Sequence, residues 1–225
     1  MDARRITFVV PVLNEAAGIV RALRALAPLR ARGHEVIVVD GGSEDGTADL
    51  ARPLADRVLA APRGRALQMN AGAGAAHGDA FLFLHADVRL PQGADRMVQE
   101  ALAARRWGRF DVALDSPRAL LALVGAMMNL RSGLTGIATG DQALFVRRDV
   151  FESTGGYAEI PLMEDIELSA RLRRIERPAC LRARVLVSAR RWEAHGALRT
   201  IVLMWRLRLA YFLGADPGRL AERYR

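Results

Sequence analysis

Three apolar runs, the first stopped by Pro11 and the other two followed directly by polar residues, constrain the fold of this chain more than any other feature. The runs cover residues 6–10, 36–39 and 80–84, and stretches with helical spacing of apolar residues lie between them. Strands that are buried on both faces of a parallel sheet have this continuous apolar character. Their alternation with helices predicts βαβ units and an α/β fold, in which helices flank a mixed, mainly parallel central sheet.

Turn and cap residues divide the rest of the chain into further elements of the same kind. Glycine-rich turns follow residue 40 and residue 63, and Gly155-Gly156 interrupts the pattern further on. Such residues punctuate helices and strands. We expect strands at 6–10, 35–40, 57–60, 80–84, 110–114, 142–147 and 184–187, and helices at 19–29, 47–55, 64–77, 94–105, 119–130 and 166–175.

Arginine supplies every basic residue of the chain. The 225 residues include 33 arginines and no lysine, and the formal net charge is +8. This charge is compatible with nucleic acid, an anionic membrane surface or a phosphorylated substrate as a partner, although a genome-wide preference for arginine is the better explanation. Nucleic acid is the weakest of these, because the chain has no zinc-finger spacing, aromatic RNA-binding signature or concentrated basic arm.

The sequence carries no signal for export or for membrane insertion. Cys180 is the only cysteine, so an intramolecular disulfide is impossible. The apolar run near the N-terminus is too short for a signal peptide, and no stretch reaches the roughly 18 apolar residues that span a bilayer. We therefore expect a cytoplasmic protein.

Three acidic residues stand where predicted strands end or a predicted helix begins. Asp40 and Asp87 follow buried strands, and Asp165 precedes a helix. Each has an ordinary structural explanation, either an Asx turn or a favourable charge at a helix N-terminus. Their joint placement indicates more, because the carboxyl ends of neighbouring strands in an open α/β sheet border one crevice.

Short segments around these acidic residues follow one another in a fixed order. They are residues 8–15 (FVVPVLNE), 39–47 (VDGGSEDGT), 64–72 (GRALQMNAG), 84–87 (LHAD), 140–142 (GDQ), 155–157 (GGY) and 163–168 (MEDIEL). In this order they resemble family-2 glycosyltransferases of the GT-A fold. The chain is most similar to the small bacterial members associated with radical-SAM/selenium-domain clusters.

The resemblance implies a single GT-A domain over residues 1–225. Its nucleotide-binding half would reach to about residue 90, its acceptor half would cover about 91–195, and C-terminal helices would follow over about 196–225. It also implies an inverting, metal-dependent transferase that moves a sugar from a nucleotide sugar, in particular a UDP-sugar, to an acceptor hydroxyl.

The resemblance assigns the donor site residue by residue. Asp40 would accept a hydrogen bond from a uracil-like base, and Arg65 would approach the base or the phosphates. Asp87 occupies the last position of the DxD motif, whose carboxylate binds Mg²⁺ or Mn²⁺ on the diphosphate. The complete donor-binding set is Pro11, Asn14, Glu15, Asp40, Arg65, Ala86 and Asp87.

The resemblance likewise assigns the acceptor side. Asp165 matches the general base that takes the proton of the acceptor hydroxyl. Asp141, Glu164, Arg191 and Trp192 would lie on the acceptor or diphosphate side.

Two positions depart from the family pattern. His85 stands at the first acidic position of the DxD motif, and we read it as a strand-end residue or as a neighbour of the metal site. Ser188 replaces the glutamine of the QxxRW motif, which argues against a processive polymer synthase. His195 is more simply a loop histidine than a metal ligand.

The stretch from Leu198 to Leu213 is apolar with interspersed arginines. It predicts a helix that lies at a membrane interface, pairs in a homodimer or packs against the sheet. Weak peripheral membrane contact at the inner face would suit a lipid-linked acceptor. We read Met127, Met128 and Trp205 as packing residues.

Two alternative functions stay open. A non-catalytic nucleotide-sugar-binding or scaffold protein would keep the fold, although the retained Asp87 and Asp165 speak against it. A sugar nucleotidyltransferase has a related sheet, but Pro11-Val12-Leu13-Asn14-Glu15 stands where such enzymes carry a glycine-rich phosphate loop. The residues do not identify the sugar, the acceptor or the choice between Mg²⁺ and Mn²⁺.

Overall fold

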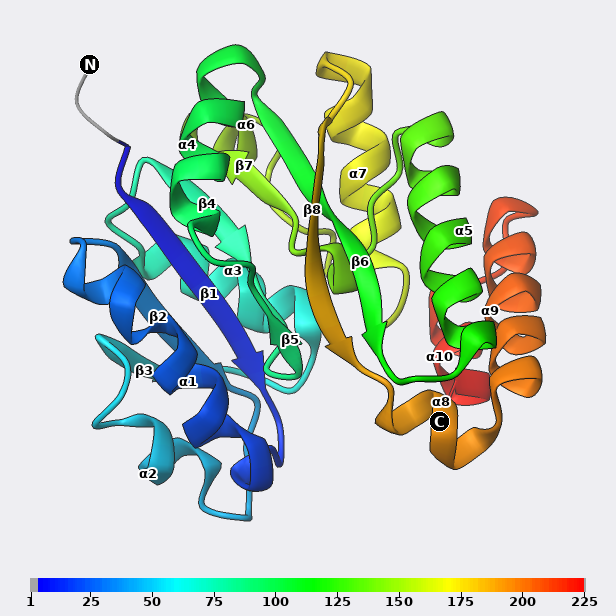
Figure 1. Ribbon diagram of the computed structural model, residues 1–225, viewed down its shortest axis with the longest axis horizontal. Helices are drawn as coiled ribbons and strands as arrows, with labels where there is room; N and C mark the ends of the chain where they lie inside the picture. The colour runs from blue at the N-terminus through cyan, green and yellow to red at the C-terminus, as the bar shows by residue number, and fades with distance from the viewer. Residues whose placement is uncertain (1–3, 225) are drawn as a thin grey trace.

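The structure is a computed structural model that describes residues 4–224, without the side chains of Arg191, Ala194 and His195. Within residues 4–224, eight strands form one sheet: β1 (Ile6–Val12), β2 (Glu35–Asp40), β3 (Arg57–Ala60), β4 (Ala80–Phe83), β5 (Val88–Arg89), β6 (Trp107–Asp115), β7 (Phe145–Arg147) and β8 (Ala179–Ser188). Their order across the sheet is β3-β2-β1-β4-β7-β6-β8-β5 (Figure 1).

The sheet is mixed and mainly parallel, as the sequence predicts. β3, β2, β1 and β4 run parallel to one another, and β6 runs parallel to β8. β7 runs antiparallel to both β4 and β6, and β5 runs antiparallel to β8. The direction of the sheet therefore reverses beside β4.

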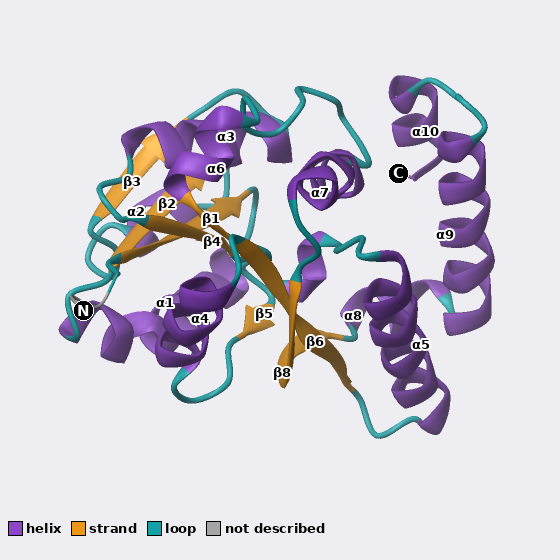
Figure 2. Cartoon of the chain, turned by 90° about the horizontal axis from the view of Figure 1, so that it is seen from above, coloured by secondary structure: helices purple, strands orange, loops and turns teal. Residues whose placement is uncertain are grey.

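Helices cover both faces of this sheet. They are α1 (Ala16–Ala31), α2 (Thr47–Ala51), α3 (Arg65–Ala75), α4 (Ala94–Ala104), α5 (Ala119–Thr135), α6 (Arg148–Ser153), α7 (Glu164–Ile175), α8 (Arg190–His195), α9 (Ala197–Phe212) and α10 (Pro217–Tyr224), with a 3₁₀ turn, η1, at Gly140–Gln142. Viewed from above, α1 and α4 lie on one side of β1 and β4, whereas α3 and α6 lie on the other (Figure 2).

Alternation along β1 explains why it is buried on both faces. Phe8 and Val10 pack in one core cluster with α1, whereas Val9 packs in the other with α3. Gly72 of α3 lies directly on Val9, and a Cβ atom there would overlap the Val9 side chain. The glycine therefore lets α3 approach the sheet closely, which brings the first turn of α3 to the end of β1.

The C-terminal helices pack away from the sheet. Leu207 of α9 and Leu220 of α10 share a small cluster with Ile137, Met163 and Ile166, near the beginning of α7. α9 consequently stands at one edge of the molecule beside α5 in both views (Figures 1 and 2). No helix in residues 4–224 combines the length and the apolar character needed to cross a membrane.

Several predicted boundaries differ from the structure for local reasons. The expected strand over 142–147 begins only at Phe145, because a capping box at Thr139 closes the η1 turn first. The expected strand over 184–187 begins at Ala179, since its first part alternates half-buried and exposed residues and lacks a continuous apolar run. Met127 and Trp205 are not core residues, because their exposed fractions are 50% and 69%. Met128 packs against the core as expected.

Candidate active site

A cavity of about 710 Å³ lies at the carboxyl ends of β1 and β4. Its walls come from the end of β1, the first turn of α3, the segment after β4, the end of β8 and the C-terminal helices. Among the predicted site residues, the lining includes Pro11, Glu15, Arg65, Ala86, Asp87, Asp141 and Trp192. The fold thus gathers residues from both predicted halves at one opening.

Asn14 holds the loop after β1 in place from outside the cavity lining. Its backbone is left-handed, with φ 54°, a conformation that asparagine tolerates better than most residues. The backbone amide of Asn14 donates to Ser43 Oγ at 2.8 Å, and its side-chain Oδ1 accepts from the Glu44 backbone amide at 3.0 Å. The Glu15 amide donates to Thr47 Oγ1 at 2.8 Å. These bonds join the two predicted nucleotide-binding loops.

Asp40 forms the Asx turn that the sequence allows for it. Its Oδ2 accepts the amides of Gly42 and Ser43 at 3.2 and 3.0 Å, and its Oδ1 accepts the Ser43 hydroxyl. The residue is 8% exposed and does not line the cavity. The Asp40 carboxylate therefore holds the turn after β2 in place.

Gln68 is a cavity residue that the sequence did not single out. Its Nε2 donates to the carbonyl oxygens of Val12 and Val39, both at 2.8 Å, so it ties the ends of β1 and β2 together beneath the site. A polar residue on the buried face of a helix is the only sequence signal for this role.

Arg65 stands at the beginning of α3 and faces the beginning of α7. Its Nη1 lies 3.6 Å from Glu164 Oε1. Burial lowers the pKa of Arg65, but the charge of Glu164 and contact with Tyr224 raise it by more, so the net shift is upward. The guanidinium thus links α3 to α7 and to α10.

The segment after β4 carries His85, Ala86 and Asp87 into the cavity. His85 Nδ1 lies 3.5 Å from Asp141 Oδ1. Burial opposes the charged form of each, yet their mutual hydrogen bond and charges raise the pKa of His85 and lower that of Asp141. The two side chains therefore favour an ion pair, and His85 is more than a strand-end residue.

The Asp87 carboxylate faces the cavity with oxygens that accept no hydrogen bond from the described residues, unlike those of Glu15, Asp141 and Asp165. It lines the cavity, and none of the residues from 4 to 224 that the structure describes donates a hydrogen bond to that carboxylate. Its backbone carbonyl accepts the Ser188 amide at 3.1 Å. The main chain is thus fixed while the side chain can accept an external ligand.

Asp165 and Glu164 occupy the first turn of α7, after Met163 in a left-handed conformation with φ 70°. Asp165 Oδ2 accepts the Gly140 amide and Oδ1 accepts the Ile166 amide, both at 2.7 Å. Neither acidic residue lines the cavity. Asp165 is nevertheless close to it in the chain of contacts, because its partner Gly140 directly precedes Asp141, a lining residue. Burial and the charge of Asp165 raise the pKa of Glu164.

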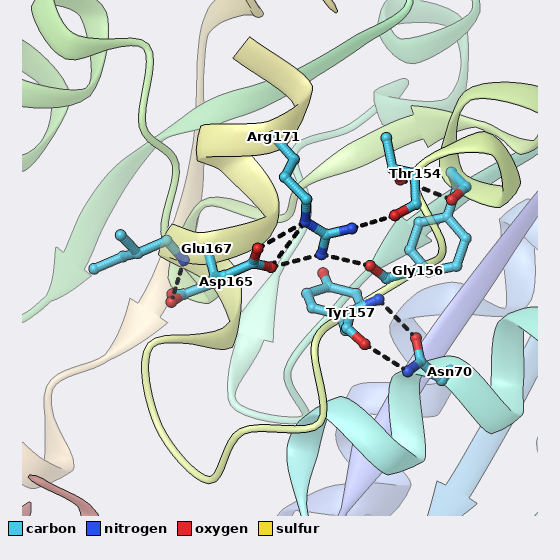
Figure 3. Close-up of polar contacts among 9 residues, drawn as sticks. Asn70, Thr154, Gly156, Tyr157, Asp165, Glu167 and Arg171 are labelled. Atoms are coloured by element: carbon cyan, nitrogen blue, oxygen red, sulfur yellow. Dashed lines mark hydrogen bonds and ion pairs between the residues drawn. The ribbon is translucent and has the colours of Figure 1, made fainter. Parts of the chain in front are cut away.

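A polar network anchors the loop before α7 (Figure 3). Arg171 Nη2 donates to the Gly156 carbonyl at 2.7 Å, and Arg171 Nε donates to Glu167 Oε1 at 2.7 Å. On the other side, the Asn70 amide group bonds both to the carbonyl and to the amide of Tyr157, each at 2.9 Å. The motif residues 155–157 thus connect α3 with α7.

Two arginines near Asp165 have buried guanidinium nitrogens without partners. Nε and Nη2 of Arg131 and Nε of Arg208 are buried and form no hydrogen bond with any residue that the structure describes. Burial and the charge of Arg208 lower the pKa of Arg131 to about 10, against the opposing charge of Asp165. Local sequence patterns do not predict this pair, because α5 and α9 are far apart along the chain.

Comparison with known proteins identifies the family. A sequence model described as Glycosyl transferase family 2 matches residues 7–119. The chain belongs to glycosyl transferase family 2. No curated protein matches it significantly by sequence.

Solved structures agree with a GT-A fold for this family 2 chain. It resembles TarS 1–349 of S. aureus, solved with UDP, at 17% identity and a TM-score of 0.66, over 82% of this chain and 60% of that one. A mannosyltransferase from Pyrobaculum calidifontis, solved with GDP-Man and Mn²⁺, has 20% identity and a TM-score of 0.65, over 98% and 69%. Glucosyl-3-phosphoglycerate synthase from Mycobacterium tuberculosis, solved with Mn²⁺, UDP and phosphoglyceric acid, has 20% identity and a TM-score of 0.58, over 82% and 69%. This chain thus spans about three-fifths of the TarS chain.

The carboxylates of this family 2 chain fit a cation that is bound largely by its substrate. No group of three or more His, Cys, Asp and Glu side chains in the described residues is arranged to hold a metal ion. Mg²⁺-type sites, however, need only one or two carboxylates when substrate phosphates and water supply the other ligands. The Asp87 carboxylate meets this requirement. A site formed by protein side chains alone would need more ligands than the described residues bring together.

Two predicted residues of this glycosyltransferase-family chain lie partly or wholly outside the description. The backbone of Arg191 and His195 belongs to α8, but their side chains are not described. Next to them, Arg190 Nη2 lies 3.3 Å from Glu15 Oε2 and Trp192 lines the cavity. Thr200, Met204 and Tyr224 of the C-terminal helices also line it, a contribution that the sequence did not predict.

Proposed function

We propose that this chain transfers a sugar from a nucleotide sugar, in particular a UDP-sugar, to an acceptor hydroxyl, with inversion at the anomeric carbon. The observation that carries the proposal is the Asp87 carboxylate, which lines the cavity and accepts no hydrogen bond from the described residues. It follows β4, beside the turn before β7 whose Gly140 amide donates to Asp165. Family membership and the nucleotides in the titles of the solved neighbours support the proposal.

On the donor side, Pro11, Glu15 and Arg65 would surround the nucleotide and its diphosphate. The guanidinium of Arg65 suits a phosphate group, because its planar fork of donors matches two oxygens at once. Asp40 would contact the base only through lone pairs that its own turn leaves free. Ala86 and Asp87 would place the diphosphate at the end of β4.

Asp87 is the residue that would hold a divalent cation, which when bound neutralises the charge that develops on the diphosphate leaving group. The His85–Asp141 ion pair would keep the neighbouring main chain in one position. Mn²⁺ in two neighbour structures supports a divalent cation in general and leaves the choice between Mg²⁺ and Mn²⁺ to experiment.

On the acceptor side, Asp165 would act as the general base. Two backbone amides orient its carboxylate and leave further lone pairs for the acceptor hydroxyl. As the acceptor oxygen bonds to the anomeric carbon, its proton passes to Asp165 and the bond to the diphosphate breaks with its electron pair. Attack opposite the leaving group inverts the centre. Asp141, Glu164, Arg191 and Trp192 would border this side.

The test separates donor binding from transfer. Asp87→Asn should abolish the metal-dependent part of donor binding, whereas Asp165→Asn should bind the donor normally and lose at least about 100-fold in transfer rate. Asp49→Asn, whose carboxylate is 83% exposed on α2, is the matched control and should behave as wild type. Unchanged transfer in both site variants would contradict the assignment.

The same experiment decides between the enzyme and the scaffold alternative. A scaffold would bind a nucleotide sugar but show no transfer in the wild-type chain with any acceptor. Thermal shifts with UDP- and GDP-sugars, each with Mg²⁺, Mn²⁺ or a chelator, identify the donor class, because a ligand raises stability by RT ln(1 + [L]/Kd). The cytoplasmic location, the radical-SAM-associated subgroup, a lipid-linked acceptor and a homodimer remain predictions.

A further inference from the structure

The exposed apolar side chains of this protein are concentrated on two helices. Among the described residues, thirteen large hydrophobic side chains are exposed, and only Leu50 and Ile175 lie outside residues 120–134 and 198–213. Single exposed apolar residues are ordinary, but a contiguous group marks an interaction surface. The other eleven are Leu120, Leu123, Met127, Leu130, Leu134, Leu198, Val202, Trp205, Leu209, Phe212 and Leu213.

The exposed residues form a stripe along each helix. On α5 they recur at intervals of three and four residues, as they do on α9 from Leu198 to Phe212. This spacing places them on one side of a helix. On the opposite side of α9, Thr200 and Leu207 are buried. Each helix therefore packs with one face and presents an apolar face outward.

α5 and α9 are neighbours, so the two stripes belong to one side of the molecule. Both views place the helices next to each other at the edge away from β1–β3 (Figures 1 and 2). The charges of Arg131 on α5 and Arg208 on α9 act on each other, which confirms the proximity. We call the eleven exposed residues of the two stripes the α5–α9 face.

The charged side chains of α5 and α9 all have one sign. Neither helix contains an acidic residue, and Arg118, Arg199 and Arg206 are exposed at the beginning of α5 and along α9. An apolar stripe with basic residues and an exposed tryptophan is the arrangement of helices that lie in the headgroup region of anionic membranes.

We propose that the α5–α9 face binds an anionic lipid membrane surface. Its apolar side chains enter the headgroup boundary, and its arginines contact anionic headgroups. A second copy of the chain fits less well, because a two-fold interface places the same patch on both partners. Arginines would then face arginines, with no acidic residue on either helix to compensate.

This orientation would put the candidate active site close to the lipid. Thr200 and Met204 of α9 line the cavity from the side opposite the exposed stripe, so α9 forms both a cavity wall and part of the membrane-binding face. Membrane binding itself needs no donor, metal or transfer, and it is therefore tested separately from the proposed function.

The first experiment measures binding of the 225-residue chain to vesicles. Vesicles of phosphatidylcholine alone are compared with vesicles that contain about a third phosphatidylglycerol, by flotation and by tryptophan emission. We expect at least tenfold stronger partitioning to the anionic vesicles, weakened by added salt. Emission should shift to the blue as Trp205, 69% exposed in the free protein, enters the headgroup region. In Trp205→Phe the shift should disappear.

Paired variants test both parts of the α5–α9 face. Arg199→Gln with Arg206→Gln should weaken partitioning about 30-fold, the factor for two basic residues at about 1 kcal/mol each. Arg21→Gln with Arg24→Gln, exposed on α1, removes the same charge and should change it less than threefold. Leu209→Ser with Phe212→Ser should weaken partitioning more than tenfold, whereas Leu50→Ser, exposed on α2, should not.

Three results would overturn the proposal. They are absence of binding to anionic vesicles, equal loss in the α1 and α9 arginine variants, and a concentration-dependent dimer that Leu209→Ser with Phe212→Ser dissociates. The last result would assign the face to a second copy of the chain. Thermal shift with nucleotide sugars on the same samples reports donor binding independently of any of these.

Discussion

The amide of Gly140 donates a 2.7 Å hydrogen bond to Asp165 Oδ2, so the turn that enters β7 and the first turn of α7 form one unit. The same glycine lies against His85 of the segment after β4. A single backbone position thus contacts both the proposed general base and the proposed metal-binding segment.

Gly140→Ala should destabilise the fold by about 1–3 kcal/mol, the usual cost of an added methyl group in a packed site. The new Cβ would lie 2.5 Å from His85 Cε1, closer than real contacts allow. Urea unfolding of Gly140→Ala, His85→Ala and the double variant should show positive coupling, because His85→Ala removes the clashing ring. Gly74→Ala, with open space around its Cα, is the control and should cost nothing. Simple additivity in the cycle would refute the steric account.

Asn70→Ala should lower both stability and transfer. It removes the two hydrogen bonds that hold Tyr157, for about 2 kcal/mol in total. Asn129 makes the same pair of bonds to Val112, at 2.8 and 2.9 Å, on α5. Asn129→Ala should therefore lose similar stability in urea unfolding while retaining the transfer rate of folded protein. Equal loss of transfer would mean that the loop at 155–157 has no special link to the reaction.

Arg131→Met should stabilise the protein by about 1–2 kcal/mol, because a half-buried guanidinium whose Nη1 alone donates, to the Ile137 carbonyl at 3.4 Å, costs more than a well-packed apolar side chain. Its Nε and Nη2 atoms have no partner in the described residues, and burial together with Arg208 lowers its pKa to about 10. Guanidinium denaturation measures the change, with exposed Arg21→Met as the control. Destabilisation would indicate that Asp165 compensates the charge more fully than the contacts suggest.

Stability should fall in acid partly through Glu35, which is 3% exposed at the beginning of β2. Burial raises its pKa, but hydrogen bonds from the His77 amide, Thr7 and the His77 ring lower it by more, so the folded pKa lies below the unfolded one. The carboxylate therefore stabilises the fold above the unfolded pKa, and this contribution disappears as pH falls through the folded pKa.

Glu35→Gln tests this by removing the titration. The variant should be about 2 kcal/mol less stable than wild type at pH 7, since hydrogen bonds to a charged group are lost. The difference should shrink as pH falls from 5 to 3 in urea unfolding. Exposed Glu44→Gln should follow the wild-type curve throughout, and a difference that grows in acid would reverse the sign argued for Glu35.

Local pattern was sufficient for most of the sheet and for the positions of the segments that carry the predicted donor-side residues. Buried parallel strands are continuous apolar runs, so the ends of β1 and β4, and with them Pro11 and Asp87, could be located from the sequence. β8 was predicted too short because one of its faces is partly exposed, and the two-residue β5 has no pattern at all.

The acceptor side depends on contacts between distant segments, which periodicity does not encode. Tyr224 meets Arg65 and Arg131 meets Arg208 only because α9 and α10 return to α7. The ion pair of His85 was not predicted for the same reason, since its partner Asp141 is 56 positions away along the chain.

The reversal of the sheet at β7 has a mechanical consequence. Because β7 runs antiparallel to β4, the residues that enter β7 meet those that leave β4 at one edge, and Asp141 comes beside His85. In a fully parallel sheet, the entrance to the next strand would lie at the opposite edge. The segments that carry Asp87 and Asp141 therefore leave and enter adjacent strands of one hydrogen-bonded sheet. Main-chain hydrogen bonds between β4 and β7 thus fix the spacing of these two segments.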